Sequence, residues 1–505
     1  MIEIFHKIVR HIGLFLTMLI SYCNNTVKPA LSIGPPPIVI AKPAPGDTAR
    51  YVTIEMDIIK AKKPAFYFTD LPYDKNKGLL LMKDDGLLTD YTIVYKILSG
   101  GIVNGKRYPG FTYTDGTGKN IGYKYSFAVN PNEGHTTDLN NVTSWAQMNE
   151  MAGKGHTLMN HSLNHSGQDK LKAIKDAEIN LYKHIYYRMT EIVPPANDEG
   201  YIGTGLQLGY HMFSSEFGDP IPDGYNKYLT NGTNIPVTTQ DFDKVLVYRN
   251  NLGDQWNAEE LQRSKTYIDQ AFNNVDSTKK LIGAAFSHGP FGDRADAADN
   301  FFAFIMYIKN HPRNHDSVWI TSSKEMMDYE RTKRTVKIAS QHYDKLSGKY
   351  KIVLDMGAVN PNVIYRSLSL KVTGGTISNV KGTGVKEVTY NSSTGLINIY
   401  KTDRSKVKDP AKDVLPPQII STVAKDNIIT ITYDRDVNQT KAEGYTVIGN
   451  NVLQLKGGGK IWQLIMQDNV KPDQVFDYRI QKGDAIDLKQ PALHVCTYIG
   501  LPIKI

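Results

Sequence analysis

The sequence predicts an α/β domain built on a parallel sheet, followed by one or two all-β modules. Between residues 49 and 333, short continuous apolar runs alternate with segments whose apolar residues recur every three or four positions. After residue 334 the runs are short and strand-like, and turn residues separate them. Buried strands alternating with amphipathic helices are typical of parallel sheets covered by helices, whereas closely spaced strands and turns are typical of β-sandwiches.

Length and composition fit this organisation. The 505 residues exceed one ordinary domain and correspond to roughly three domains. Hydrophobic residues make up 41% of the chain and charged residues 22%, which excludes wholesale disorder. The net charge of +8 is spread without a basic block, so we expect no nucleic-acid partner. Two cysteines are too few for a disulfide framework or a four-thiolate zinc site.

The first 23 residues are predicted to be an export signal. Lys7 and Arg10 precede the apolar run IGLFLTMLI, which is too short to span a bilayer but matches the apolar core of a signal. The run ends at Cys23 in a pattern that resembles a bacterial lipoprotein processing site, with Tyr22 where a small residue is usual. We expect a periplasmic or cell-surface protein, lipid-anchored at Cys23 in a bacterial envelope; ordinary secretion stays open.

Residues 24–48 are rich in proline and are predicted to form a semi-rigid spacer before the α/β domain of residues 49–333. Within that domain, buried strands are predicted at residues 78–82, 123–130, 156–160, 244–248, 281–286 and 317–321. Helices are predicted at residues 169–192, 258–272 and 299–309. Hydrophobic periodicity does not choose between a closed barrel and an open doubly wound sheet.

Two all-β modules are predicted after the α/β domain, at residues 334–411 and 415–505. Between them, KDVLPP is predicted to be a linker. Neither module contains a convincing helix of useful length. The second begins PPQIISTVAKDNIITITYDRDV, which resembles the opening of bacterial immunoglobulin-like modules. Cys496, in the second module, is expected to be a buried or inert thiol.

A pair of carboxylates follows the first predicted buried strand. Asp84 and Asp85 come directly after the apolar run LLLM. Adjacent carboxylates at the end of a buried strand are electrostatically unfavourable unless a cation or separate hydrogen bonds stabilise them. The alternative is a polar turn in which one of the two caps a helix over residues 87–98.

Histidines follow two other predicted strands. His161 and His165 come after TLM, and their side chains share one face if this segment turns helically. Neutral imidazoles together with a carboxylate suit zinc or a similar divalent metal. His288 follows LIGAAF and precedes a glycine, so it could act as an exposed acid or base. Each histidine could instead be an ordinary loop or core residue.

The three clusters share a position in the predicted fold, because each one follows the carboxyl end of a strand. In barrels and open parallel sheets these ends lie on one side, where active sites form. One site could therefore combine two carboxylates with three histidines. Such a set provides a metal with open coordination positions and a separate acid and base, which are the elements of metal-assisted hydrolysis.

The motifs resemble those of a known enzyme family. Asp84-Asp85-Gly86, the segment GHTLMNHSLNH and His288 are similar to motifs of the polysaccharide deacetylases of the NodB-homology type, carbohydrate esterase family 4. The continuous segment from residue 145 to residue 165 resembles the helix, glycine turn, strand and H(S/T)xxH motif of that family. The resemblance covers residues 65–329 and implies an irregular (β/α) barrel.

The resemblance also implies a function and a set of roles. The protein would be a metal-dependent hydrolase that removes acetyl groups from an N-acetylated or O-acetylated polysaccharide or oligosaccharide. Asp85, His161 and His165 would bind a divalent metal, with zinc as the first choice. Asp84 would be the general base and His288 the general acid. The expected partner is an acetylated glycan.

Two motifs depart from the family pattern. The stretch IVPPAN at residues 192–197 lacks the expected arginine and aromatic residue, and Arg249 is a candidate to replace that arginine from another strand. The motif that orients the acid histidine corresponds at best to Asp254 and Trp256, with one residue inserted between them.

Two alternatives stay open. The insertion at residues 100–122, rich in glycine and tyrosine, could form a rim loop against the substrate or a surface hairpin. The whole chain could be a non-catalytic surface glycan-binding protein built on a deacetylase-like barrel, since the altered motifs bear on turnover more than on metal binding.

Overall fold

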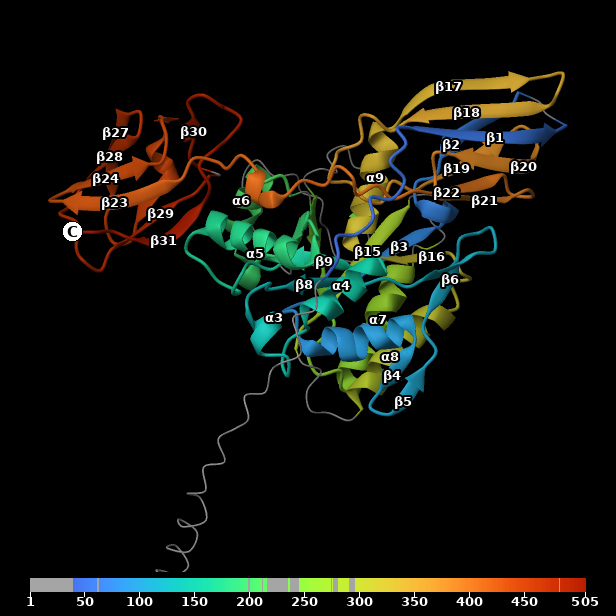
Figure 1. Ribbon diagram of the computed structural model, residues 1–505. Coiled ribbons are helices and arrows are strands. Elements are labelled where there is room, and N and C mark those ends of the chain that lie inside the picture. The colour runs from blue at the N-terminus through green and yellow to red at the C-terminus, as the bar shows by residue number, and fades with distance from the viewer. Residues whose placement is uncertain are drawn as a thin grey trace, which may run out of the picture. The chain divides into compact units, whose positions relative to one another are not determined.

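The computed structural model (Figure 1) describes residues 40–60, 63–198, 200–210, 212–215, 235–236, 245–273, 275, 280–289, 296–480 and 482–505. The helices and strands below belong to one unit, Ala41–Ile505. The predicted export signal, Cys23 and most of the predicted spacer lie outside the described residues. None of the helices in the described ranges has the length and apolar character needed to cross a membrane.

A parallel sheet forms the centre of the α/β part. In pairing order it contains β15 (Leu281–Ser287), β3 (Lys77–Lys83), β8 (Ser126–Val129), β9 (Thr157–Asn160), β10 (Glu191–Ile192), β11 (Met212–Ser215) and β13 (Val245–Tyr248). After one residue β13 continues as β14 (Asn250–Asn251), which pairs with β15. The sheet therefore curls round until its last strand meets its first. The predicted α/β class with a parallel sheet is confirmed.

Two further strands complete this sheet among the described residues. β16 (Val318–Thr321) pairs with the first half of β3, and β12 (Ile235–Pro236) runs antiparallel to β15. Every residue of β3 and β15 is buried, which is the pattern expected of parallel strands covered on both faces. Each of the six predicted strands overlaps an observed one, because continuous burial produces continuous apolar runs. The strands β10 and β11 were not predicted, and β10 lies at the end of the segment predicted to be a helix over residues 169–192.

The α-helices described between residues 134 and 335 are α3 (Gly134–Thr137), α4 (Trp145–Gly153), α5 (Lys170–Ile185), α6 (Gly200–Gln207), α7 (Ala258–Phe272), α8 (Ala297–Asn310) and α9 (Ser323–Thr335). Among these helices, α5, α7 and α8 correspond to the three predicted by residue range. α7 matches its prediction, and a capping box between Asn257 and Glu260 begins it. The helix predicted at 169–192 is shorter, because Tyr186 takes a left-handed φ of 55° and ends α5.

The helix expected over residues 87–98 is found over residues 88–99, and its middle part is a π-helix. A π-helix, η2 (Asp90–Tyr95), leads into the short α2 (Lys96–Ser99). The residue that precedes this helical stretch is Leu87, which forms a β-bridge with Val142, and the backbone N–H of Leu88 donates to the carbonyl oxygen of Asn141. The two carboxylates after β3 therefore do not cap this helix, and the capping alternative for Asp84 and Asp85 is wrong.

Two four-stranded antiparallel sheets form the first β module. One contains β17 (Lys337–Asp344), β18 (Lys349–Asp355), β1 (Tyr51–Ile59) and β20 (Thr376–Thr383). The other contains β2 (Ala65–Phe68), β19 (Leu368–Thr373), β22 (Leu396–Tyr400) and β21 (Glu387–Asn391). Figure 1 shows the blue strands β1 and β2 beside the gold and orange strands from later in the chain.

The boundary predicted at residue 49 therefore needs correction, because β1 and β2 pair with strands of the 334–411 module. The burial of β1 alternates along the strand, as in an antiparallel sheet with one covered face, and differs from the continuous burial of β3. Gly46 also forms a β-bridge with Asp403. The predicted spacer thus ends before residue 48.

The second β module has its own apolar core. One sheet contains β23 (Ile419–Lys425), β24 (Ile428–Tyr433), β28 (Ile461–Met466) and β27 (Val452–Gly458). The other strands are β25 (Val437–Asn438), β26 (Tyr445–Val447), β29 (Val475–Tyr478), β30 (Ile486–Asp487) and β31 (Tyr498–Pro502). Tyr433, Trp462 and Phe476 lie in the core, and Cys496 is a buried free thiol. Beyond α9 the described helical segments are the short 3-10 turns η5 (Pro410–Lys412) and η6 (Ala442–Gly444).

The insertion at residues 100–122 folds into two hairpins. They consist of β4 (Gly101–Val103) with β5 (Lys106–Tyr108), and β6 (Thr112–Thr114) with β7 (Asn120–Gly122). The backbone N–H of Thr114 donates to the Asp316 carboxylate, two residues before β16 begins. The second hairpin therefore lies at the amino ends of the parallel strands, and it is not a rim loop beside Asp84.

Candidate functional site

The turn after β3 separates its two carboxylates. The backbone N–H of Asp84 still donates to Ser287 of β15, with an N–O distance of 3.1 Å, so Asp84 continues the strand ladder. Asp85 and Gly86 then take left-handed φ values of 83° and 66°. The two carboxylates have different partners, Asp84 with Arg249 and Asp85 with His161 and His165, and these contacts offset the repulsion between adjacent charges.

Arg249 holds Asp84 through two hydrogen bonds. Nη1 donates to Oδ1 at 2.7 Å and Nη2 donates to Oδ2 at 2.6 Å, with both side chains almost fully buried. Burial acts to raise the pKa of Asp84, but the charge and hydrogen bonds of Arg249 outweigh it and hold the pKa below its ordinary value. Arg249 lies between β13 and β14, so closure of the sheet brings it to Asp84.

His288 lies beside the same carboxylate. Its Nε2 is 3.5 Å from Oδ2 of Asp84, and its Nδ1 is 3.4 Å from Oδ1 of Asp254. The edge of the Phe286 ring packs against the imidazole, with 4.9 Å between ring centroids. About a third of the side chain, 33%, is exposed. The imidazole is thus oriented by a carboxylate at each nitrogen and remains accessible.

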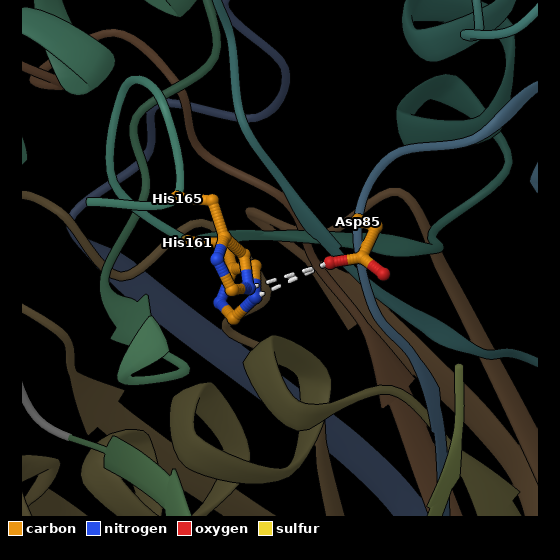
Figure 2. Close-up of side chains that lie close together, drawn as sticks. All are labelled: Asp85, His161 and His165. Carbon is orange, nitrogen blue, oxygen red and sulfur yellow. Dashed lines mark ion pairs between the residues drawn. The ribbon is translucent and has the colours of Figure 1, made fainter. Parts of the chain in front are cut away.

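Asp85, His161 and His165 converge on one point (Figure 2). Oδ1 of Asp85 is 3.6 Å from Nε2 of His161 and 3.7 Å from Nε2 of His165. The three ligand atoms lie within 4.8 Å of one another. Ligands that share an ion at ~2.1 Å stand ~3–4 Å apart. The spacing therefore fits one small divalent cation.

The protonation states also fit a cation. Nδ1 of His161 lies 2.7 Å from the carbonyl oxygen of Val193 and donates to it, which leaves the lone pair on Nε2. Nε2 is buried and has no hydrogen-bond partner among the described residues. Burial acts to raise the pKa of Asp85. The contacts with His161 and the other imidazoles outweigh burial and lower this pKa to about 2. Burial lowers the pKa of His165 and favours its neutral form.

The segment that carries the two histidines is not helical, in contrast to the expectation. Ser162 and His165 have left-handed φ values of 61° and 59°. The side-chain amide of Asn130 donates to the carbonyl oxygens of His161 and Ser162, and Asn132 donates to that of Leu163. Sequence reasoning missed Asn130, although it follows β8 at the same edge of the sheet as Asp84.

Two departures from the family pattern have different outcomes. The IVPPAN stretch contributes the carbonyl of Val193, which orients His161. Trp256 is fully buried in the core, with ring centroids 5.1 Å from Phe301 and 5.2 Å from Phe304. We therefore assign Trp256 a packing role. Asp254 is the member of this motif that lies beside His288.

A buried ion pair at the same strand end was also missed from the sequence. Nζ of Lys83, the last residue of β3, is 2.8 Å from Oδ1 of Asp90, and both side chains are fully buried. Burial raises the pKa of Asp90 to about 7, against the opposing charge of Lys83. In the sequence, the signal for this ion pair is a lysine at the end of an apolar strand followed within a few residues by an aspartate.

No protein-family model and no curated protein matches the chain. Similar solved structures include the Streptococcus pyogenes deacetylase PplD in complex with acetate, 18% identical over 26% of this chain and 54% of that chain, with a TM-score of 0.20. The Bacillus subtilis peptidoglycan deacetylase PdaC is 15% identical over 52% and 95%, with a TM-score of 0.26. Bacillus subtilis PdaA, a family 4 carbohydrate esterase, is 12% identical over 52% and 84%, with a TM-score of 0.26.

Proposed function

We propose that the protein is a metal-dependent hydrolase that removes acetyl groups from an acetylated polysaccharide or oligosaccharide. The observation that supports this proposal is that two groups of side chains with different partners lie next to each other. Asp85, His161 and His165 form a cation site, while Asp84 and His288 stand beside it with their own partners. We propose that this site lies on an irregular (β/α) barrel.

The side chains have complementary tasks in this reaction. When bound, a divalent cation supplies Lewis acidity, which polarises an acyl oxygen and lowers the pKa of water from 15.7 to ~7. Asp84, kept ionised by Arg249, is placed to take the proton of the attacking water. His288, held by Asp254, is placed to donate a proton to the departing sugar nitrogen or oxygen.

We propose zinc as the metal, because two neutral imidazoles and one carboxylate suit a first-row divalent ion. A hollow of about 780 Å³ beside the histidine segment is lined in part by Leu163 and Asn164. We propose that a glycan extends from the site into this hollow, although none of the five proposed site residues lines it. Its other lining residues include Asn132, Glu133 and Lys183. Amide, carboxylate and ammonium groups of this kind can form hydrogen bonds with sugar hydroxyls.

Export, lipid attachment at Cys23 and a bacterial envelope location are part of the same proposal. A surface polymer would then be within reach of a chain tethered through its amino-terminal spacer. We propose that the modules after residue 334 act as spacers, and an immunoglobulin-like character for residues 415–505 stays a prediction. No nucleic-acid partner is proposed.

Release of acetate tests the proposed function. Purified protein supplied with zinc should liberate acetate from a panel of N-acetylated and O-acetylated saccharides, and a chelator should stop the release. If the protein binds these saccharides tightly without liberating acetate, and the chelator leaves binding unchanged, the glycan-binding alternative replaces the hydrolase.

Replacing Arg249 with methionine is expected to change both stability and pH dependence. Removing one partner of a buried ion pair leaves Asp84 unpaired and should cost about 3–5 kcal/mol of unfolding free energy. The main interactions that oppose burial would then be lost, so the pKa of Asp84 rises and the acid limb of the kcat/KM profile moves to higher pH. Arg249→Lys keeps the charge and should shift this limb less. An acid limb that stays in place in R249M would show that Arg249 does not control Asp84.

A further inference from the structure

Residues 494–500 of the second β module lie against the segment that follows His165. We call these seven residues the brace segment. The backbone N–H of Ile499 donates to the carbonyl oxygen of Gln168, with an N–O distance of 3.4 Å. Asp169 and Tyr498 form an antiparallel β-bridge. The backbone contacts with the module are therefore made by Gln168 and Asp169, three and four residues after His165.

The brace segment also covers α6. The backbone N–H of His494 donates to Oε1 of Gln207 at the end of this helix, at 3.1 Å. At its start, a Cβ on Gly200 would stand 3.1 Å from Cγ2 of Thr497. Residues 495–498 are all buried, with at most 1% of any of them exposed. The contact is thus a packed seam that extends along the whole helix.

α6 in turn packs against the residues that follow His165. Tyr201, on its first turn, is 1% exposed, and its hydroxyl would lie 3.6 Å from a Cβ on Gly167. Lys170 stands over the Tyr201 ring at 4.6 Å and donates to the carbonyl oxygen of Gly167 at 2.6 Å. The brace segment therefore acts on the turn after His165 both directly, through Gln168, and through α6.

The histidine segment needs such support. Ser162 and His165 are non-glycine residues with left-handed backbone, a conformation that persists only where the surroundings hold it. Asn130 and Asn132 hold the first half of the segment through hydrogen bonds to its carbonyls. The side chain of His165 is 49% exposed, so its position depends on the backbone that follows it.

We propose that the brace segment of the second β module positions His165 for metal binding, and that the module is thereby a working part of the metal site. This inference rests on the proposed function for the identity of the ligand, a divalent metal. The module would then be more than the spacer suggested by its sequence.

The substitution Ile499→Pro tests the proposal. It removes the N–H that reaches Gln168, and β31 lies at the edge of its sheet, where proline is tolerated. β31 pairs with β29 through Tyr498 and Leu501, on either side of a register shift, so the pairing residues are kept. We expect zinc affinity, measured by competition with a chromophoric chelator, to fall 10–100-fold, as for other groups that support a ligand.

Hydrogen exchange in the metal-free protein provides a second readout. Amides of residues 163–169 should exchange at least about tenfold faster in I499P, because local opening controls their protection. Leu464→Ala is the matched control, since Leu464 is fully buried in the core of the same module. It should lower the melting temperature while leaving zinc affinity and the exchange of these amides unchanged.

The outcomes separate this proposal from the proposed function. Wild-type zinc affinity and wild-type exchange in I499P would overturn the brace, and so would an equal loss of affinity in L464A.

If the wild-type protein binds no zinc, the proposed function fails, and positioning for metal binding fails with it. The exchange data would still report whether the brace segment holds the histidine segment. If I499P does not fold, Gln207→Ala, which removes the acceptor of His494, should weaken zinc binding in the same direction; unchanged affinity would overturn the proposal.

Discussion

Replacing His161 with alanine is expected to abolish stoichiometric binding of a divalent metal. His161 is the buried member of the three proposed ligands, and its Nε2 has no hydrogen-bond partner among the described residues. Loss of a direct ligand should cost more than the 10–100-fold in affinity that outer groups cost, so we expect a loss of at least about 100-fold. Elemental analysis after dialysis and chelator competition measure the effect.

An exposed histidine supplies the control for this experiment. His342 lies on β17 of the first β module, so His342→Ala makes the same chemical change away from the site. It should bind metal as the wild-type protein does. Retention of one tightly bound metal per chain in H161A would mean that the cation site is elsewhere, and it would remove the basis of the proposed mechanism.

Replacing Asp84 with asparagine is expected to reduce acetate release by about 10²–10⁴-fold, the usual contribution of a general base. The amide has nearly the shape of the carboxylate but cannot take a proton from water. Since Asp84 contacts Arg249 and His288 while Asp85 faces the two metal ligands, D84N should retain its metal. Two measurements check this prediction: the initial rate of acetate release from a saccharide that the wild-type protein deacetylates, and the metal content of D84N.

Asp85→Asn is the matched comparison, because the neighbouring residue carries the same charge and undergoes the same change. It should lose both metal and activity, whereas D84N loses activity alone. If D84N lost its metal, or D85N kept both metal and activity, the roles assigned to the two neighbouring carboxylates would be wrong.

Much of the site could be predicted because parallel strands end at one edge of a sheet. Asp84, His161 and His288 each follow a strand whose continuous apolar sequence marks it as buried, so their proximity follows from topology. The pairing of Arg249 with Asp84 could be suspected only from a missing arginine. It depends on β13 and β14 completing the curl of the sheet, which periodicity does not show.

Other features depend on backbone conformation and long-range pairing. The left-handed turns at Ser162 and His165 replace the helical turn that the i, i+4 spacing suggested. The carbonyl of Val193 is invisible to residue-type reasoning, because any side chain carries the same backbone group. β1 and β2 were assigned to the wrong part because their partners are some 300 residues later, as with Tyr51 and Asp355.

Anomalous diffraction at the zinc edge, from crystals grown with a zinc salt, tests the central claim most directly. We expect one strong peak per chain, ~2.0–2.2 Å from Oδ1 of Asp85 and from Nε2 of both His161 and His165. Zinc bound only at other residues, with no peak between these three side chains, would contradict the account.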